Sequence, residues 1–503
     1  MSALKWLAPF VPGYVGSRSL SELGVDPQTI TDPASIDKEF LVLDNIFAPF
    51  TRPACLDVKI TLPSREKQLD RIGVGNLLGC YIHGVESDKV SFRNRFNEYT
   101  GRNKPIDHFY WTFRKFFTRL QAPEHQRREL LAKMRKLATV LSNLSTLGFH
   151  FVSSSILFVY EQKVTEDAVS PNLYLVDFER TLYKGVPLAK YISAPETFEN
   201  PVATFASAEE FAAKPPRYAN DNLSRVSRII THAARQYLFP DEFAVTVYLV
   251  RHGERHDYTD FSWAPNSPYP HDAHLSEAGE RQSEDFVDRL RHLKVQRLAS
   301  APMQRAVLGA EPIARATRSM ICIEPGFTEF LCSKTRTRVP NFFSHEVSIS
   351  PWVDDAYKPY WPTITLETWP DVFRRSAVAV EGLLGDCRKG KGDLVIISHR
   401  STLQTVFKAL LPDFEDDTML EYGGMSMISE TEPGSGKFEM ITFNELNHLR
   451  DKIKSPSSNP FRHIEGYYED LSWSTYKSTA EMWENSDGKK EEGKGEGEKA
   501  TVG

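Results

Sequence analysis

Residues 248–255 read Tyr-Leu-Val-Arg-His-Gly-Glu-Arg, and this stretch decides the fold and the chemistry of the second half of the chain. It ends an apolar run from Phe243 to Val250 that predicts a buried strand. A strand that ends here would deliver Arg251 and His252 to the carboxyl end of a sheet, where α/β proteins bind their ligands. Gly253 would let the backbone turn closely beneath a bound group.

A histidine flanked by arginines suits phosphoryl transfer. A neutral imidazole can attack phosphorus, and the resulting phosphohistidine divides one difficult displacement into two easier ones. The planar guanidinium of arginine matches phosphate oxygens and offsets the charge that develops in the transition state. An isolated Arg-His-Gly is more often a surface turn, so the prediction that His252 is a nucleophile depends on further motifs.

Two other predicted strands end in residues of the same kind. Residues 298–306, Leu-Ala-Ser-Ala-Pro-Met-Gln-Arg-Ala, place Arg305 on the first turn of a helix, where anions are favoured. Residues 395–400, Val-Ile-Ile-Ser-His-Arg, place His399 just beyond the end of a third strand. Three strand ends that carry Arg-His, Arg and His predict one phosphate site.

Helical and strand patterns alternate through this half, which predicts a parallel sheet covered by helices. The predicted helices are 276–292, 302–316 and 373–385, and the predicted strands are 296–300, 320–324 and 394–398. In the first half, the predicted elements are a strand at 40–43, a helix at 124–146, a pair of strands at 151–160 and 173–178, and a helix at 223–237.

These motifs resemble the histidine phosphatase superfamily, relatives of the phosphoglycerate mutases. The form Arg-His-Gly-Glu-Arg-x-Asp, with Trp263 following, is most similar to the branch that contains the suppressor-of-T-cell-receptor-signalling and ecdysteroid-phosphate phosphatases. The segment 275–279, Leu-Ser-Glu-Ala-Gly, matches a helix start of the family, with Ser276 as N-cap.

The resemblance implies roles for five residues and requires no cofactor for the phosphatase. It implies that His252 is the nucleophile and that the phosphate is bound by Arg251, Arg255, Arg305 and His399, the last also a catalytic residue. In place of the small residue that usually follows the second histidine, this chain has Arg400. That arginine could add charge to the pocket or point away from it.

The proton donor to the leaving group should be a carboxyl group. Residues 324–329, Glu-Pro-Gly-Phe-Thr-Glu, match the family segment that supplies it. We predict that Glu329 is the acid, with Glu324 as the alternative. Either could instead be an ordinary solvated loop carboxylate.

The first half carries a second set of motifs. Residues 52–60 read Arg-Pro-Ala-Cys-Leu-Asp-Val-Lys-Ile, residues 153–161 begin with three serines, and residues 173–178 end an apolar strand in Asp-Phe. An Asp just after such a strand is where kinases hold magnesium between ATP phosphates. Taken alone, the residues Asp-Val-Lys in a strand would be interpreted as part of an ordinary solvent-exposed face.

Together these motifs resemble the inositol polyphosphate kinase family. The resemblance implies that Asp177 binds magnesium, that Lys59 contacts phosphate, and that Asp57 assists the attacking hydroxyl. It places Asp44 and Asn45 at the nucleotide hinge, and it implies ATP and magnesium as cofactors if this half is active.

The first half departs from the family at several positions. The family's signature glycine is replaced by Thr61, and its hinge acid by Asn45. The family's early strands and the lysine that binds the ATP phosphates have no counterpart upstream of Phe10. Two alternatives therefore stay open for this half, an active kinase whose gene model is truncated or a non-catalytic binding module.

We therefore predict an α/β protein with two folded units. A three-layer, phosphoglycerate mutase-like domain with a mainly parallel sheet spans 242–447, and an α+β inositol polyphosphate kinase-like domain with an incomplete N-lobe spans 1–236. A C-terminal extension, 448–484, leads to a disordered Lys/Glu/Gly-rich tail, 485–503.

Composition limits the location and the partners. The net charge of −6 gives no global attraction to nucleic acid or anionic membrane, and no stretch approaches the roughly 20 apolar residues of a membrane span. The five cysteines lack a CxxC pair and fit neither disulfides nor zinc. We expect a cytoplasmic protein, with the nucleus as a second compartment.

The kinase-like and phosphatase-like halves suggest opposing control of one phosphorylated metabolite. The expected substrate is an inositol phosphate. The alternative is a phosphoprotein or a small ester, dephosphorylated by a protein-tyrosine or small-ester phosphatase whose first half is a catalytically dead module. The sequence does not specify the oligomeric state.

Overall fold

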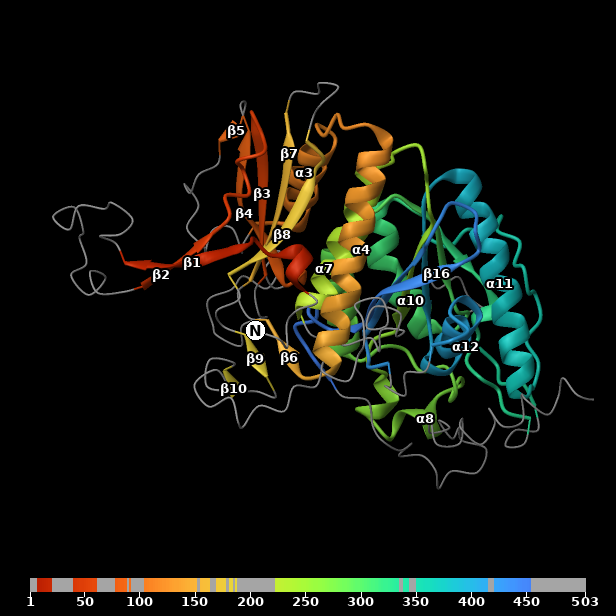
Figure 1. The fold of residues 1–503 in the computed structure, drawn as a ribbon. Coiled ribbons are helices and arrows are strands. Elements are labelled where there is room, and N and C mark those ends of the chain that lie inside the picture. Colours follow the sequence, from red (N-terminus) through yellow and green to blue (C-terminus); the bar gives the residue numbers. More distant parts are fainter. Residues whose placement is uncertain are drawn as a thin grey trace, which may run out of the picture.

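A computed structural model describes most of the two predicted units, and Figure 1 shows their arrangement. A small sheet built by the first half lies on one side, a larger sheet built by the second half lies on the other, and helices lie between them (Figure 1). The described residues are 7–19, 39–60, 77–87, 90–91, 104–151, 154–162, 169–177, 181–183, 186–187, 222–333, 338–342, 350–414 and 420–453. The predicted C-terminal extension beyond residue 453 and the predicted tail lie outside them.

The second half forms a six-stranded sheet in the order β13-β12-β14-β11-β15-β16. Its strands are β11 (Thr246–Arg251), β12 (Val295–Ser300), β13 (Ile321–Ile323), β14 (Asp393–Ser398), β15 (Met425–Glu430) and β16 (Phe438–Glu445). The first four in sheet order are parallel, and β15 and β16 add antiparallel strands at one edge. Every residue of β11 and β14 is buried, as expected for strands covered on both faces.

Four long helices cover this sheet and pack in two pairs, α9 with α10 and α11 with α12. They are α9 (Glu277–Leu290), α10 (Gln304–Thr317), α11 (Trp369–Gly390) and α12 (Arg400–Leu410). The predicted N-cap is confirmed, because the hydroxyl of Ser276 accepts a hydrogen bond from the Gly279 N–H at 3.0 Å. The mainly parallel sheet is also confirmed.

The structure differs from the predicted elements of this half at four elements. Helix α11 is longer than the predicted 373–385 because Thr368 and Asp371 form a capping box that starts it earlier. Helix α12, and strands β15 and β16, were not predicted at all. The shorter elements of this half are η5 (His256–Tyr258), α8 (Trp263–Asn266) and η6 (Pro325–Phe327).

The first half forms a five-stranded antiparallel sheet in the order β5-β4-β3-β7-β8. Its strands are β3 (Pro53–Ile60), β4 (Cys80–Ser87), β5 (Val90–Ser91), β7 (Ser155–Glu161) and β8 (Asn172–Val176). Burial alternates strictly along β3, so that alternate residues face a core and the rest face outward. Strands β7 and β8 are the predicted pair.

Among the described residues of this half, three long helices and several short strands accompany the sheet. The helices are α3 (Ile106–Phe117), α4 (Glu124–Thr146) and α7 (Asn222–Leu238), and the last two match the predicted helices. The short strands are β1 (Tyr14–Ser19), β2 (Glu39–Leu43), β6 (Phe149–His150), β9 (Leu182–Tyr183) and β10 (Val186–Pro187).

The two halves share one continuous hydrophobic core. Helix α7 contacts β3 of the first sheet and β16 of the second. At this junction Glu445 forms buried ion pairs with Arg225 of α7 and with Arg289 of α9, the latter at 2.7 Å. Burial alone would raise the pKa of Glu445, but the two guanidiniums hold it below its ordinary value.

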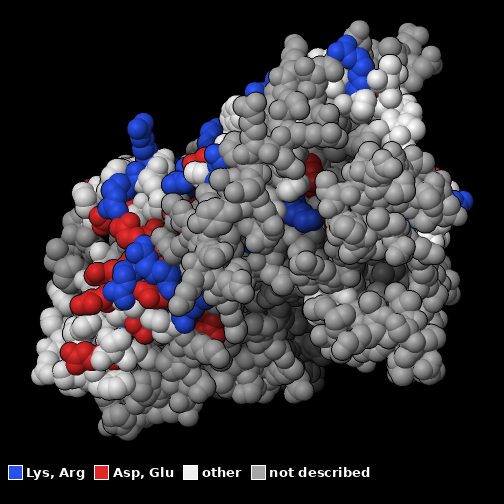
Figure 2. All heavy atoms as spheres, turned by 90° about the vertical axis from the view of Figure 1, so that its left-hand side faces the viewer, with Lys and Arg blue, Asp and Glu red and all other residues white. Residues whose placement is uncertain are grey.

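Among the described residues, no helix is long and apolar enough to cross a membrane. All five cysteines are free thiols in the structure. Figure 2 shows one face of the molecule, on which the described Lys and Arg side chains are mixed with Asp and Glu. This mixture agrees with the expectation that anions are bound in local pockets and not over a broad basic surface.

Candidate active sites

His252 follows β11 directly and is buried at the carboxyl end of the sheet. Its Nδ1 lies 2.7 Å from the carbonyl oxygen of Gly253. A carbonyl can only accept, so Nδ1 carries the proton and the lone pair of the neutral ring resides on Nε2. Burial lowers the pKa of His252 well below its ordinary value, and nearby Arg305, His399 and Arg251 lower it further. The ring is therefore a neutral base with a defined nucleophilic nitrogen.

Arg305 and His399 lie beside this ring, as the sequence predicted. The ring centroids of His252 and His399 are 5.0 Å apart. Arg305 Nη2 lies 3.4 Å from His399 Nδ1, and since arginine only donates, the proton of a neutral His399 is on Nε2. Within the described part of the chain, His399 Nε2 and the Nε and Nη1 atoms of Arg305 are buried without a hydrogen-bond partner, although Nη1 lies in an ion pair 3.7 Å from Asp272 Oδ1. Buried donors of this kind usually bind something, and three together suit an anion.

The other two predicted arginines are also buried near the histidines. Arg251 Nη1 donates to the Leu420 carbonyl at 2.6 Å, and its guanidinium lies 4.0 Å from the ring centroid of Tyr422. Arg255 donates through Nε and Nη2 to the two carboxylate oxygens of Asp257, at 2.9 and 2.6 Å. This fork fixes the plane of the Arg255 guanidinium.

The two candidate acids have different surroundings. Glu329 Oε2 accepts from Arg305 Nη2 at 2.5 Å, which places its carboxyl group at the edge of the histidine site. Glu324 is fully buried and accepts from the backbone N–H groups of Gly326, Tyr360 and Trp361 and from the hydroxyl of Tyr357. With all its oxygens engaged by structural donors, Glu324 is unsuited to exchange protons with a substrate.

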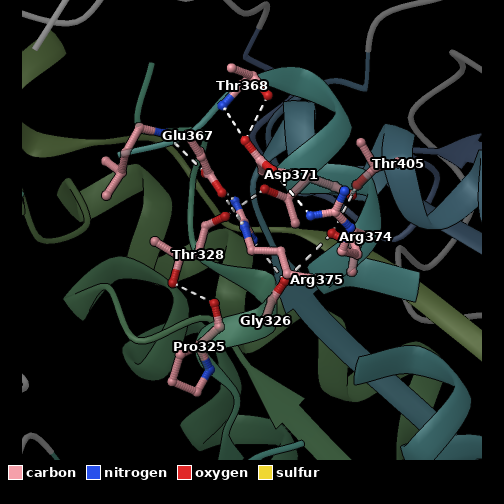
Figure 3. Close-up of polar contacts among 12 residues, drawn as sticks. Pro325, Gly326, Thr328, Glu367, Thr368, Asp371, Arg374, Arg375 and Thr405 are labelled. Carbon is pink, nitrogen blue, oxygen red and sulfur yellow. Dashed lines mark hydrogen bonds and ion pairs between the residues drawn. The ribbon is translucent and has the colours of Figure 1, made fainter. Parts of the chain in front are cut away.

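A buried arginine that the sequence analysis missed supports the loop before Glu329. Figure 3 shows Arg375 of α11 between Glu367 and Gly326. Its Nε and Nη2 each donate to Glu367 at 2.7 Å, and its Nη1 donates to the Gly326 carbonyl at 2.7 Å. Arg375 thereby ties the turn 325–327 to α11. In the sequence, the one indication of this role is that Arg375 lies on the apolar face of a predicted helix.

Two further hydrogen bonds tie the same loop to the strand and helix that flank His399. The Ser398 hydroxyl donates to the Phe327 carbonyl, and the Thr402 hydroxyl donates to the Thr328 carbonyl, both at 2.7 Å. His399 itself is the N-cap residue of α12, and Arg400 begins that helix as a buried residue. The backbone N–H groups at this helix start favour an anion near His399.

The kinase-like residues of the first half also come together. Lys59 Nζ and Asp177 Oδ2 form an ion pair at 2.6 Å. The sheet register explains the contact, since Lys59 pairs with Ser155 and Ser155 pairs with Val176, directly before Asp177. Asp57, two residues earlier on the same face of β3, has its pKa raised by burial. Asp177 adopts a left-handed backbone with φ of +60°, which is uncommon outside glycine and is often found at functional sites.

The predicted hinge residues follow β2 and are exposed. The Asp44 N–H donates to the Gly13 carbonyl at 2.8 Å, and Asn45 Oδ1 accepts from the Phe47 N–H at 3.0 Å. Within the described ranges, no polar contact joins these two residues to the ion pair of Lys59. The structure therefore does not bring them into the same cluster.

A magnesium ion with nucleotide phosphates would fit the carboxylate at the end of β8. The described residues include no group of three or more His, Cys, Asp or Glu side chains that could hold a metal alone. Magnesium in kinases takes one or two carboxylates and completes its shell with phosphate oxygens and water. The half-exposed carboxylate of Asp177 suits that role.

Comparison with known proteins identifies both halves. Residues 247–445 match the model of the histidine phosphatase superfamily (branch 1), and residues 40–200 match the inositol polyphosphate kinase model. The chain therefore contains a histidine phosphatase domain and an inositol polyphosphate kinase family domain.

The relatives found are similar to one half or the other. The ecdysteroid-phosphate phosphatase of Bombyx mori is 26% identical over 35% of this chain, and the alignment spans only 32% of that protein. Its crystal structure with tungstate has 22% identity, covers 44% of this chain and 99% of that one, and has a TM-score of 0.34. A Bacillus anthracis phosphoglycerate mutase has 14% identity, coverages of 42% and 96%, and a TM-score of 0.31. The inositol phosphate multikinase Ipk2 of S. cerevisiae, in complex with ADP and Mn²⁺, has 17% identity, coverages of 38% and 91%, and a TM-score of 0.24.

Proposed function

We propose that residues 242–447 hydrolyse phosphate monoesters through a phosphohistidine intermediate on His252. The observation that carries the proposal is the fixed tautomer of His252, whose Nδ1 is bound to the Gly253 carbonyl while three donors of Arg305 and His399 without a hydrogen-bond partner lie alongside. A nucleophile without its own proton and a set of anion-binding donors are the two requirements of phosphoryl transfer by histidine.

The reaction balances with residues of this chain and water alone. His252 Nε2 forms a bond to phosphorus while the bond from phosphorus to the ester oxygen breaks, and Glu329 gives its proton to the departing alcohol. Glu329 then takes a proton from water, the water oxygen attacks phosphorus, and the bond to His252 breaks to release inorganic phosphate. The guanidiniums of Arg251, Arg255 and Arg305 offset charge on the phosphoryl oxygens in both steps.

For the first half, residues 1–236, we propose an ATP-dependent phosphotransferase acting on inositol phosphates. The cluster of Asp57, Lys59 and Asp177 supports it, because a lysine and a carboxylate at one sheet end suit phosphate and magnesium. When bound, magnesium would neutralise nucleotide phosphate charge. With both activities in one chain, the substrate class we propose for His252 is also an inositol phosphate.

The phosphatase is tested with the full chain and its His252→Ala variant on a panel of inositol phosphates, a phosphotyrosine peptide and an aryl phosphate. We expect the variant to lose hydrolysis of every ester, and the wild type to retain it in excess EDTA. Activity that survives the substitution, or that EDTA abolishes, would contradict the mechanism.

The same panel separates the two candidate functions. Preference for an inositol phosphate, together with ATP binding that Asp177→Asn weakens, supports a bifunctional enzyme. Preference for the phosphotyrosine peptide, with no ATP binding, supports a protein-tyrosine phosphatase whose first half is a binding module. The ion pair of Lys59 with Asp177 favours the first outcome.

A further inference from the structure

The junction between the two halves contains a partly open cavity of about 380 Å³ whose charged lining neither candidate active site uses. Helices α4 and α7 of the first half form two of its walls, and β16 of the phosphatase sheet forms the third. Its charged residues are Arg135 on α4, Arg228 and Arg235 on α7, and Glu439 on β16.

The lining is strongly basic. Three arginines and one glutamate line it, Glu242 and Glu430 also act on Arg235 from outside the lining, and His232 adds no charge because burial lowers its pKa to about 3. Burial lowers the pKa of Arg235, and the charge of Arg135 lowers it further. The arginines are therefore close enough to repel each other. An anion bound between the guanidiniums would relieve this repulsion.

The arginines are held in place but keep donors to spare. Arg235 is 6% exposed and donates through Nη1 to the Glu430 carbonyl at 2.6 Å. Arg135 donates through Nη2 to the Thr431 carbonyl at 3.2 Å, and Arg228 is bound to the Ile441 carbonyl and the Ser142 hydroxyl. Within the described part of the chain, the remaining N–H groups of Arg135 and Arg235 have no hydrogen-bond partner.

We propose that this cavity is a binding site for a small phosphorylated metabolite, whose phosphoryl group bridges the guanidiniums of Arg135 and Arg235. A phosphate dianion would offset the repulsion between Arg135 and Arg235, and guanidiniums bind its oxygens in bidentate fashion. The hydroxyls of Thr139, Ser142 and Thr231 line the same space and can contact the rest of a polar ligand. The site is distinct from the one at His252 and does not depend on the function proposed for it.

A ligand here would connect the two halves of the chain. It would join α4 and α7 to β16, which is linked through β15 to β11, the strand that carries Arg251. We therefore expect the ligand to stabilise the junction against unfolding.

The test measures binding of inorganic pyrophosphate to the full chain by calorimetry. A His252→Ala/Arg305→Gln background removes turnover and weakens binding at the catalytic histidine. We expect Arg135→Gln to weaken binding about 10-fold or more, the usual effect of losing a charge-assisted contact. Arg128→Gln is the matched control, because Arg128 is also on α4 but pairs with Glu124 and Glu242 outside the cavity.

A second variant distinguishes a loss of binding from a loss of folding. Thr139→Glu places a carboxylate among the guanidiniums and should abolish pyrophosphate binding without lowering Tm, because it satisfies the charges that the ligand would. The proposal is overturned if the background chain binds no pyrophosphate, if both cavity variants bind as well as the background, or if Arg128→Gln weakens binding equally.

Discussion

Replacing Glu329 by glutamine tests the assignment of the acid most sharply. The side chain keeps its size and still offers an oxygen to Arg305 Nη2, now 2.5 Å from Glu329 Oε2, but it no longer carries a transferable proton. The phosphate-binding donors of Arg305 and His399 are untouched. The substitution should therefore spare substrate binding and slow the departure of the leaving group.

The size of the effect should depend on the ester. General acid catalysis contributes about 10²–10⁴-fold, or roughly 3–5 kcal/mol of barrier, when the leaving group needs a proton. A p-nitrophenolate leaves without one. We expect kcat/KM for an alkyl phosphate to fall about 10²–10⁴-fold, and the formation of phosphohistidine from p-nitrophenyl phosphate to change little.

The assay is single-turnover kinetics with both esters. Glu277→Gln, an exposed change on α9, serves as the matched control and should leave both rates unaltered. Glu324→Gln should lower stability with no dependence on the leaving group, because Glu324 accepts four structural hydrogen bonds. An equal loss for both esters in Glu329→Gln, or no loss, would refute the reasoning.

Two further predictions concern the buried charges of the fold. Glu445→Gln should lower the free energy of unfolding by about 3–5 kcal/mol, because it leaves the guanidiniums of Arg225 and Arg289 buried without their anion. Urea denaturation measures this free energy, and a loss below about 1 kcal/mol would contradict the prediction. Burial raises the pKa of Asp393 to about 7, so this carboxyl group binds its proton more tightly in the folded protein than in the unfolded chain. Its contribution to stability is therefore present below about pH 4 and is lost as the pH rises to about 7. Asp393→Asn should remove that loss of about 4 kcal/mol, so that the variant is more stable than the wild type at pH 8 but not at pH 4. If the stability of the two proteins depends on pH in the same way, the assignment is wrong.

The sequence predicted those parts of the fold and site that depend on local pattern. Strand β11, helices α4 and α7, and the N-cap of α9 follow from apolar periodicity and from Ser276. The convergence of His252, Arg305 and His399 followed from one rule, that parallel strands end at the same edge of a sheet.

What could not be predicted depends on contacts distant in sequence. Strand β15 reads Met-Ser-Met-Ile-Ser-Glu, and all six residues are buried, so its polar residues hide the alternation that marks a strand. Arg375 contacts the loop before Glu329 only because α11 packs against η6, which no local pattern specifies. The different surroundings of Glu324 and Glu329 likewise depend on hydrogen-bond partners that are distant in sequence.

The junction explains why the two halves are better regarded as one folding unit than as two domains on a linker. Helix α7 belongs to the first half in sequence, yet the Arg228 Nε donates to the Ile441 carbonyl of β16, the edge strand of the phosphatase sheet. An uncovered edge of this kind is exposed to pairing with other chains. Arg225 of the same helix also supplies one of the two cations that keep Glu445 ionised inside the core. The first half therefore stabilises the phosphatase sheet whether or not it transfers phosphate, and a ligand in the arginine-lined cavity would act on this shared structure.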